Sequence, residues 1–103
     1  MNADDAFDLL QREYDADDGL LILFRMSQDV ETARLERFIE ALNVVTMYYE
    51  GQSHVEKHAA YMIMSFHQTL SASAGHWKAS RPKGLTVPMT SEIIAALGRV
   101  FVS

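Results

Sequence analysis

The chain has 103 residues, of which 49% are hydrophobic and 22% are charged, a composition typical of one globular domain with a modest core. It has no cysteine, which excludes disulfides, thiolate zinc sites and cysteine nucleophiles. Its longest apolar run, Leu20 to Phe24, is far shorter than the roughly 20 residues that a membrane span requires, so no membrane contact is expected. The opening MNADDAFDLL is acidic where a secretory signal is positive and apolar, which predicts a cytoplasmic protein.

The net charge of −5 conceals an uneven distribution along the chain. Residues 1–56 hold thirteen acidic residues against four arginines, a net charge of −9. Residues 57–103 hold five basic residues against Glu92, a net charge of +4. The chain is thus an electrical dipole along its sequence, and the fold decides whether the two charges also separate in space.

A first helix is predicted over residues 3–14. Its apolar side chains recur three and four residues apart, and aspartates occupy its first turns, where the helix dipole favours negative charge. The turn-forming DADDG at 15–19 ends it. The apolar segment 20–26 fits a buried strand or a helical turn by periodicity, and the lack of a convincing strand partner favours the helix.

Two long amphipathic helices are predicted next, over residues 28–50 and 54–74. Ser27 or Asp29 is a suitable cap for the first, and glycine at position 51 is a typical helix end. The segment Ser53 to Glu56 fits a capping box that begins the second helix after a very short turn. Such a connection predicts a long antiparallel helical hairpin.

A last helix is predicted over residues 91–102, capped by Thr90 or Ser91, with Pro88 just outside it. Residues 75–90 then form an irregular basic loop of a length that is often functional. The sequence therefore predicts an all-α fold, a small helical bundle built on the hairpin. We expect residues 1–103 to form a single helical domain.

The loop contains GHWKASRPKG at 75–84, which places three cations around the only tryptophan. Phosphate contacts and a stacking ring are the two components of single-strand nucleic-acid binding, so a nucleic-acid-binding regulator is an alternative function. Against it, three cations are few and the acidic half would repel a polyanion. The candidate residues of this loop are Trp77, Lys78, Arg81 and Lys83.

A metal-binding helical protein is a second alternative. His54 and His58 are four residues apart, so on one helix they share a face that can hold a cation. Two ligands do not complete a site, and a solvated helix start explains them as well. We therefore expect neither a metal nor a cofactor.

Catalysis has little support in the sequence. His67 lies on an apolar helix face without a nucleophile or carboxylate at a fixed offset. The chain has no glycine-rich phosphate loop, nucleophile elbow or HExxH motif. The prediction is a protein that is not an enzyme and has no catalytic residue.

The predicted helices are apolar on more than one stripe. A chain of this size has difficulty covering that much apolar surface, and methionine and aromatic residues are enriched in interfaces. We therefore expect a homodimer or a partner protein. The apolar interface candidates are Tyr48, Tyr61, Met64 and Phe101.

An acidic surface of the first half would attract a basic protein partner. The chain is accordingly predicted to be a non-catalytic protein-binding module, a small acidic helical inhibitor, immunity or adaptor-type protein. The same surface acids would also keep the protein soluble, whether or not they bind a partner. The candidate partner-binding residues are Asp4, Asp8, Asp17, Asp18, Glu31, Glu36 and Glu40.

Overall fold

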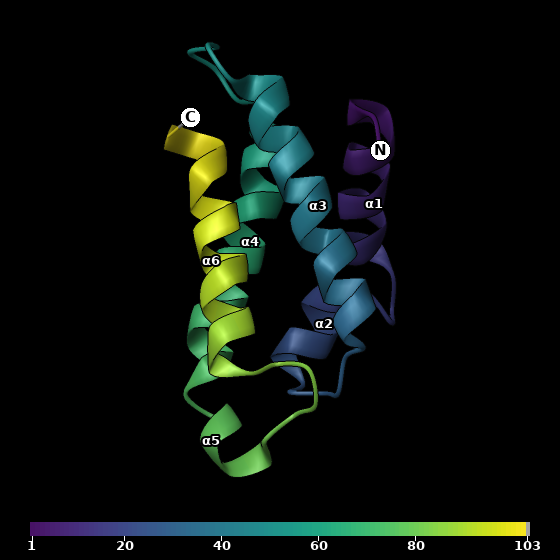
Figure 1. Ribbon diagram of the computed structural model, residues 1–103, viewed down its shortest axis with the longest axis vertical. Coiled ribbons are helices and arrows are strands. Elements are labelled where there is room, and N and C mark those ends of the chain that lie inside the picture. The colour runs from purple at the N-terminus through teal and green to yellow at the C-terminus, as the bar shows by residue number, and fades with distance from the viewer. Residues whose placement is uncertain (103) are drawn as a thin grey trace.

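The computed structural model is an all-α bundle that describes residues 1–102, with the exception of the side chain of Lys78 (Figure 1). Its described residues form six helices and no strand, which confirms the predicted small helical bundle. The helices are α1 (Ala3–Asp15), α2 (Leu20–Arg25), α3 (Thr32–Tyr49), α4 (Lys57–Ala74), α5 (Trp77–Ser80) and α6 (Val87–Val102).

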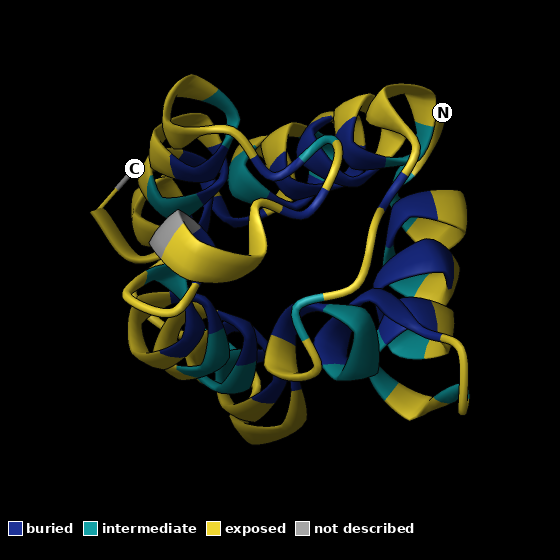
Figure 2. Cartoon of the chain, turned by 90° about the horizontal axis from the view of Figure 1, so that it is seen from below, coloured by how far each residue is buried: buried dark blue, intermediate teal, exposed yellow. Residues whose placement is uncertain are grey.

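The four longer helices form a ring in which α1 packs on α3, α3 on α6, α6 on α4, and α4 on α1. The short α2 fills the space between α1 and α4. Seen from below, the buried residues face the interior of this ring and the exposed ones face outward (Figure 2). The ring buries one apolar core that all of these helices share.

The two long helices run antiparallel as predicted, but they are not neighbours (Figure 1). They lie diagonally across the core, where the rings of Phe38 and Phe66 meet with centroids 4.9 Å apart. Residues 50–56 connect them, and that segment is long enough to cross the end of the bundle. The two helices of the predicted hairpin are therefore antiparallel but do not pack side by side.

The cause is the failure of the expected capping box. Glu56, not Ser53, directly precedes α4, and it makes no side-chain cap. The hydroxyl of Ser53 is instead hydrogen-bonded to Nδ1 of His54 at 2.9 Å. The residues of a capping box are thus present, but Ser53 makes a local side-chain contact instead of capping the start of a helix.

The start of α6 also differs from the prediction. Thr86 precedes the helix, and its Oγ1 accepts a hydrogen bond from the backbone N–H of Met89 at 3.3 Å. Pro88 lies inside the first turn, where the missing N–H has no helical acceptor to lose. The helix therefore begins at Val87, and the expected irregular loop is shorter than 75–90 because it also contains α5.

Three phenylalanines from three helices form the centre of the core. Phe24 of α2 contacts Phe38 and Phe66, with ring centroids 6.2 and 6.4 Å away in edge-to-face geometry. All three side chains are fully buried. The burial of Phe24 explains why the ambiguous apolar segment after the first turn is a short helix packed on α4.

Tyr49 at the end of α3 is a buried side chain, only 3% exposed. Among the described residues, its hydroxyl is hydrogen-bonded only weakly, by the backbone of Glu56. Burial is the main cause that raises the pKa of Tyr49 above its ordinary value of 10.0, and the carboxylate of Glu56 adds to the effect. The folded state therefore prefers the neutral ring.

Replacing Tyr49 by phenylalanine is expected to leave stability near neutral pH unchanged or to raise it by up to about 1 kcal/mol, because the buried hydroxyl that is removed makes only a weak hydrogen bond with the backbone of Glu56. The raised pKa contributes stability that is present below pH 10.0 and is lost as the pH rises through the folded value. The variant should lose less stability in alkaline solution than the wild type. Urea unfolding at neutral and alkaline pH measures both effects, and a clear loss of stability at neutral pH would show that the hydroxyl is well paired in the fold.

Candidate protein-binding surfaces

The seven acidic candidates are all exposed, and they belong to neighbouring parts of the bundle. They lie on α1, on the following turn, just before α3 and on α3 itself, and α1 packs directly on α3. We call these side chains the acidic α1–α3 side; its members are Asp4, Asp8, Asp17, Asp18, Glu31, Glu36 and Glu40.

This side is not uniformly negative. Arg12, Arg34 and Arg37 line a hollow of about 500 Å³ between α1 and α3, together with Glu13 and Asp18. Three of the four arginines of the acidic half are thus concentrated at one place. The acidic surface expected from the sequence is therefore divided by a cationic hollow.

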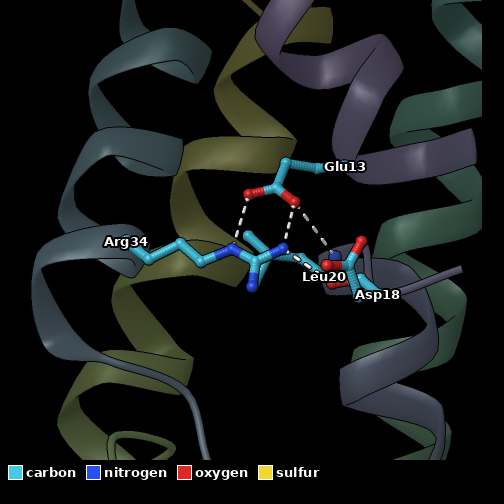
Figure 3. A network of polar contacts seen from close by, with 4 residues as sticks. All are labelled: Glu13, Asp18, Leu20 and Arg34. Carbon is cyan, nitrogen blue, oxygen red and sulfur yellow. Dashed lines mark hydrogen bonds and ion pairs between the residues drawn. The ribbon is translucent and has the colours of Figure 1, made fainter. Parts of the chain in front are cut away.

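Glu13 is one acid of this half that is buried, with only 8% of its surface exposed. Arg34 donates Nε to Glu13 Oε2 at 2.9 Å and Nη2 to Oε1 at 2.6 Å (Figure 3). The backbone N–H of Leu20 donates to the same carboxylate, and Arg34 also donates to the carbonyl oxygen of Asp18 at 2.8 Å. The network joins α1, α2, α3 and the turn between the first two, so its role is structural.

The same pair affects the arginine. The hydrogen bond with Glu13 is the largest cause that raises the pKa of Arg34. Arg34 is therefore held as a cation by Glu13, and its Nε and Nη2 atoms are occupied within the fold. Of the arginines that line this hollow, Arg12 and Arg37 are exposed to solvent.

The basic loop is held against the start of α3 rather than projecting into solvent. Trp77 Nε1 donates to Ser27 Oγ at 3.0 Å, and the N–H of Lys83 donates to Asp29 Oδ1 at 2.7 Å. The N–H of Val30 donates to the carbonyl of Lys83 at 2.9 Å. The two residues expected to cap α3, Ser27 and Asp29, thus anchor this distant segment instead, and α3 begins after them.

Trp77 is only 7% exposed, which corrects its expected role as a stacking ring. A ring with so little exposed surface does not offer an open face for base stacking. Arg81 and Lys83 are exposed, whereas the side chain of Lys78 lies outside the described residues. The nucleic-acid alternative therefore has exposed cations at Arg81 and Lys83 but no exposed aromatic ring beside them in Trp77.

A groove of about 580 Å³ opens between the α5 segment and α6, and we call it the α5–α6 groove. It contains three of the four loop candidates predicted from the sequence. Most of its other lining is apolar. The lining residues are Ala74, Trp77, Arg81, Pro82, Lys83, Gly84, Leu85, Thr86, Val87, Thr90, Ser91 and Ile94.

A second groove, of about 300 Å³, lies between α4 and α6, and we call it the α4–α6 groove. It joins two of the four apolar interface candidates: Met64 is 52% exposed and Phe101 is 47% exposed. Gly98 and His67 also line it, and an added Cβ at Gly98 would meet nothing within 4 Å. The remaining lining residues are Ile63, Gln68 and Leu97.

The other two interface candidates lie elsewhere. Tyr48 packs edge-to-face on Phe7 of α1, with ring centroids 5.4 Å apart. Tyr61 packs in the same way on Tyr14, also of α1, at 6.2 Å. Both rings thus help to hold α1 on the bundle, and the four candidates do not form one patch.

His54 and His58 do not share a helix face, because α4 begins at Lys57 and His54 precedes it. Nε2 of His58 is hydrogen-bonded to Oε1 of Gln11 at 2.6 Å. Among the described residues, no group of three histidine and acidic side chains is placed to hold a metal ion. The spacing on which the metal alternative rested is therefore not present in the fold.

Within residues 1–102, none of the helices combines the length and the apolar character that crossing a bilayer requires. Comparison with known protein families, with curated proteins and with solved structures finds no match to this chain. The function is therefore argued from the geometry of these surfaces.

Proposed function

We propose that this chain is a non-catalytic protein-binding module that forms a homodimer through the α4–α6 groove and binds a basic protein with its acidic α1–α3 side. The observation that carries the proposal is the position of the two surfaces. In the described ring, the acidic side lies on α1 and α3 and the apolar groove lies on α4 and α6, so the two surfaces belong to opposite pairs of helices. This arrangement leaves both surfaces open to different partners at the same time.

The α4–α6 groove suits a second copy because most of its described lining is apolar and one lining residue is glycine. Met64 and Phe101 each leave about half of their surface in solvent, and the open space beside Gly98 lets another helix approach closely. A two-fold axis would place the same groove on both sides of the contact. Each protruding side chain then has a matching hollow on the partner.

The acidic α1–α3 side supports the second half of the proposal. Seven exposed carboxylates on adjoining helices attract a cationic surface over roughly 10 Å at ordinary salt. The exposed Arg12 and Arg37 then fix the orientation of the partner, because an acidic group of the partner is needed opposite them. The charges of this side therefore raise the rate of association and also select the partner.

Affinity capture tests the basic partner. Tagged wild type is compared with the double reversal Glu36→Lys and Glu40→Lys, and with a control that reverses Glu50 and Glu56, two exposed acids in the connection between α3 and α4. Each capture is run in parallel with nuclease-treated and untreated lysate of the native source at moderate salt. We expect one basic protein to be retained by the wild type and the control and to be lost from the α3 variant.

Equal retention by both reversed variants would show that net charge, not this side, binds the partner. Retention that disappears on nuclease treatment would replace the proposal with the nucleic-acid alternative. If nuclease-treated lysate yields no basic protein at all, the basic-partner half of the proposal is wrong.

A further inference from the structure

The α5–α6 groove has the size and the lining of a small-molecule site. Its volume of about 580 Å³ falls within the range of roughly 300–1,000 Å³ typical of such sites. Trp77 and Leu85, both buried, contribute to it from one side, and Ile94 of α6 contributes from the other. An apolar body placed here would be removed from water on several sides, which is the main source of affinity for such ligands.

The described charged side chains that line the groove are all basic. Among the described side chains that line it, Arg81 and Lys83 are the charged ones and none is acidic. Asp29, which does not line the groove, accepts a hydrogen bond from the backbone N–H of Lys83. Since Thr86 and Ser91 add hydroxyl groups, the groove offers cations and hydrogen-bond donors to an anionic head group.

The wall that carries these cations is fixed before any ligand binds. Three hydrogen bonds tie it to the segment before α3, through Trp77 and both backbone groups of Lys83. Gly84 follows with φ of 86°, and the backbone of Arg81 has φ of 45°. A wall held in this way loses little conformational freedom on binding, which favours affinity.

We infer that the α5–α6 groove is a binding site for a small amphipathic carboxylate, with its apolar chain against Trp77, Leu85 and Ile94 and its carboxylate between Arg81 and Lys83. A neutral lipid would leave both cations without a partner, and a cationic amphiphile would be repelled. The site shares none of its lining with the α4–α6 groove and contains no member of the acidic α1–α3 side. The inference is therefore independent of the proposed function.

The chain contains its own reporter for this test, because Trp77 is the only tryptophan and lines the groove. We titrate the protein with decanoate, below the concentration at which it forms micelles, and follow tryptophan emission and heat of binding. Decanol and decyltrimethylammonium serve as neutral and cationic probes of the same chain length. We expect saturable binding of decanoate that is at least about tenfold tighter than that of decanol and weakens with salt.

Two variants separate the head group from the chain. Arg81→Asn with Lys83→Gln removes both cations, and asparagine tolerates the left-handed backbone at position 81. It should weaken decanoate about tenfold and leave decanol unchanged. The control pair, Arg25→Gln with Lys57→Gln, removes two exposed cations that do not line the groove and should bind decanoate as the wild type does.

Ile94→Glu, which places a carboxylate in the apolar wall, should abolish decanoate binding. Circular dichroism confirms that each variant is folded before its binding of decanoate is measured. Absence of saturable heat with the wild type would overturn the inference, and so would equal affinity for decanoate and decanol. Equal weakening in the groove variant and the control pair would also overturn it, because net charge alone would then explain the binding.

Discussion

Replacing Gly84 by alanine is expected to destabilise the protein by about 3 kcal/mol, a large part of the stability of a domain of this size. An ideal Cβ at this position would lie only 2.0 Å from the carbonyl oxygen of Val30, and the residue has φ of 86°. The backbone must move, which breaks the hydrogen bond from Val30 N–H to the carbonyl of Lys83. Urea unfolding followed by circular dichroism measures the loss.

Gly51 supplies a matched control for this prediction. It also has a positive φ, of 78°, but an added Cβ would meet nothing within 4 Å. Gly51→Ala should therefore cost only the backbone strain of about 1 kcal/mol. Equal losses in the two variants would show that the contact between the loop and Val30 is not important for stability.

Replacing Arg34 by methionine is expected to cost about 3 kcal/mol, because it leaves the carboxylate of Glu13 without its cation in a place that is only 8% exposed. The expected cost is at the lower end for a broken ion pair, since the arginine side chain itself is 36% exposed. The carbonyl of Asp18 also loses its donor. Denaturant unfolding at neutral pH gives the free energy directly.

Two further variants test the cause of that loss. Arg37→Met removes an exposed arginine of the same helix and should change stability by less than about 0.5 kcal/mol. Adding Glu13→Gln to Arg34→Met removes the stranded charge while keeping an acceptor for the N–H of Leu20, so it should restore part of the stability. If the double variant is less stable than Arg34→Met, the buried charge is not the cause.

The helices themselves were largely predictable from the sequence, because their apolar residues recur with helical spacing. The first helix was expected over 3–14 and is found as Ala3–Asp15. Which helices pack on one another was not predictable from the sequence. The apparent turn at Gly51 predicted that α4 begins at residue 54, whereas it begins at Lys57. The longer connection allows α3 and α4 to lie diagonally instead of side by side.

The surfaces were predictable in composition but not in position. Glu13 belongs to the same helical face as Leu9 and Leu10, and this spacing signals burial even though the residue is acidic. Nothing in the sequence pairs it with an arginine twenty-one positions away. Trp77 and Ser27 are likewise joined only by the tertiary fold, which turned an expected exposed ring into the wall of a groove.

Sedimentation velocity over a range from micromolar to several hundred micromolar protein tests the α4–α6 interface most directly. The wild type is compared with Met64→Glu, which places a charge in the groove, and with Met47→Glu, an equal change at a methionine of α3 that is 71% exposed and outside it. We predict a dimer for the wild type and for Met47→Glu, and a monomer for Met64→Glu. A wild type that remains monomeric at the highest concentration, or a Met64→Glu variant that dimerises equally well, would contradict the proposed interface.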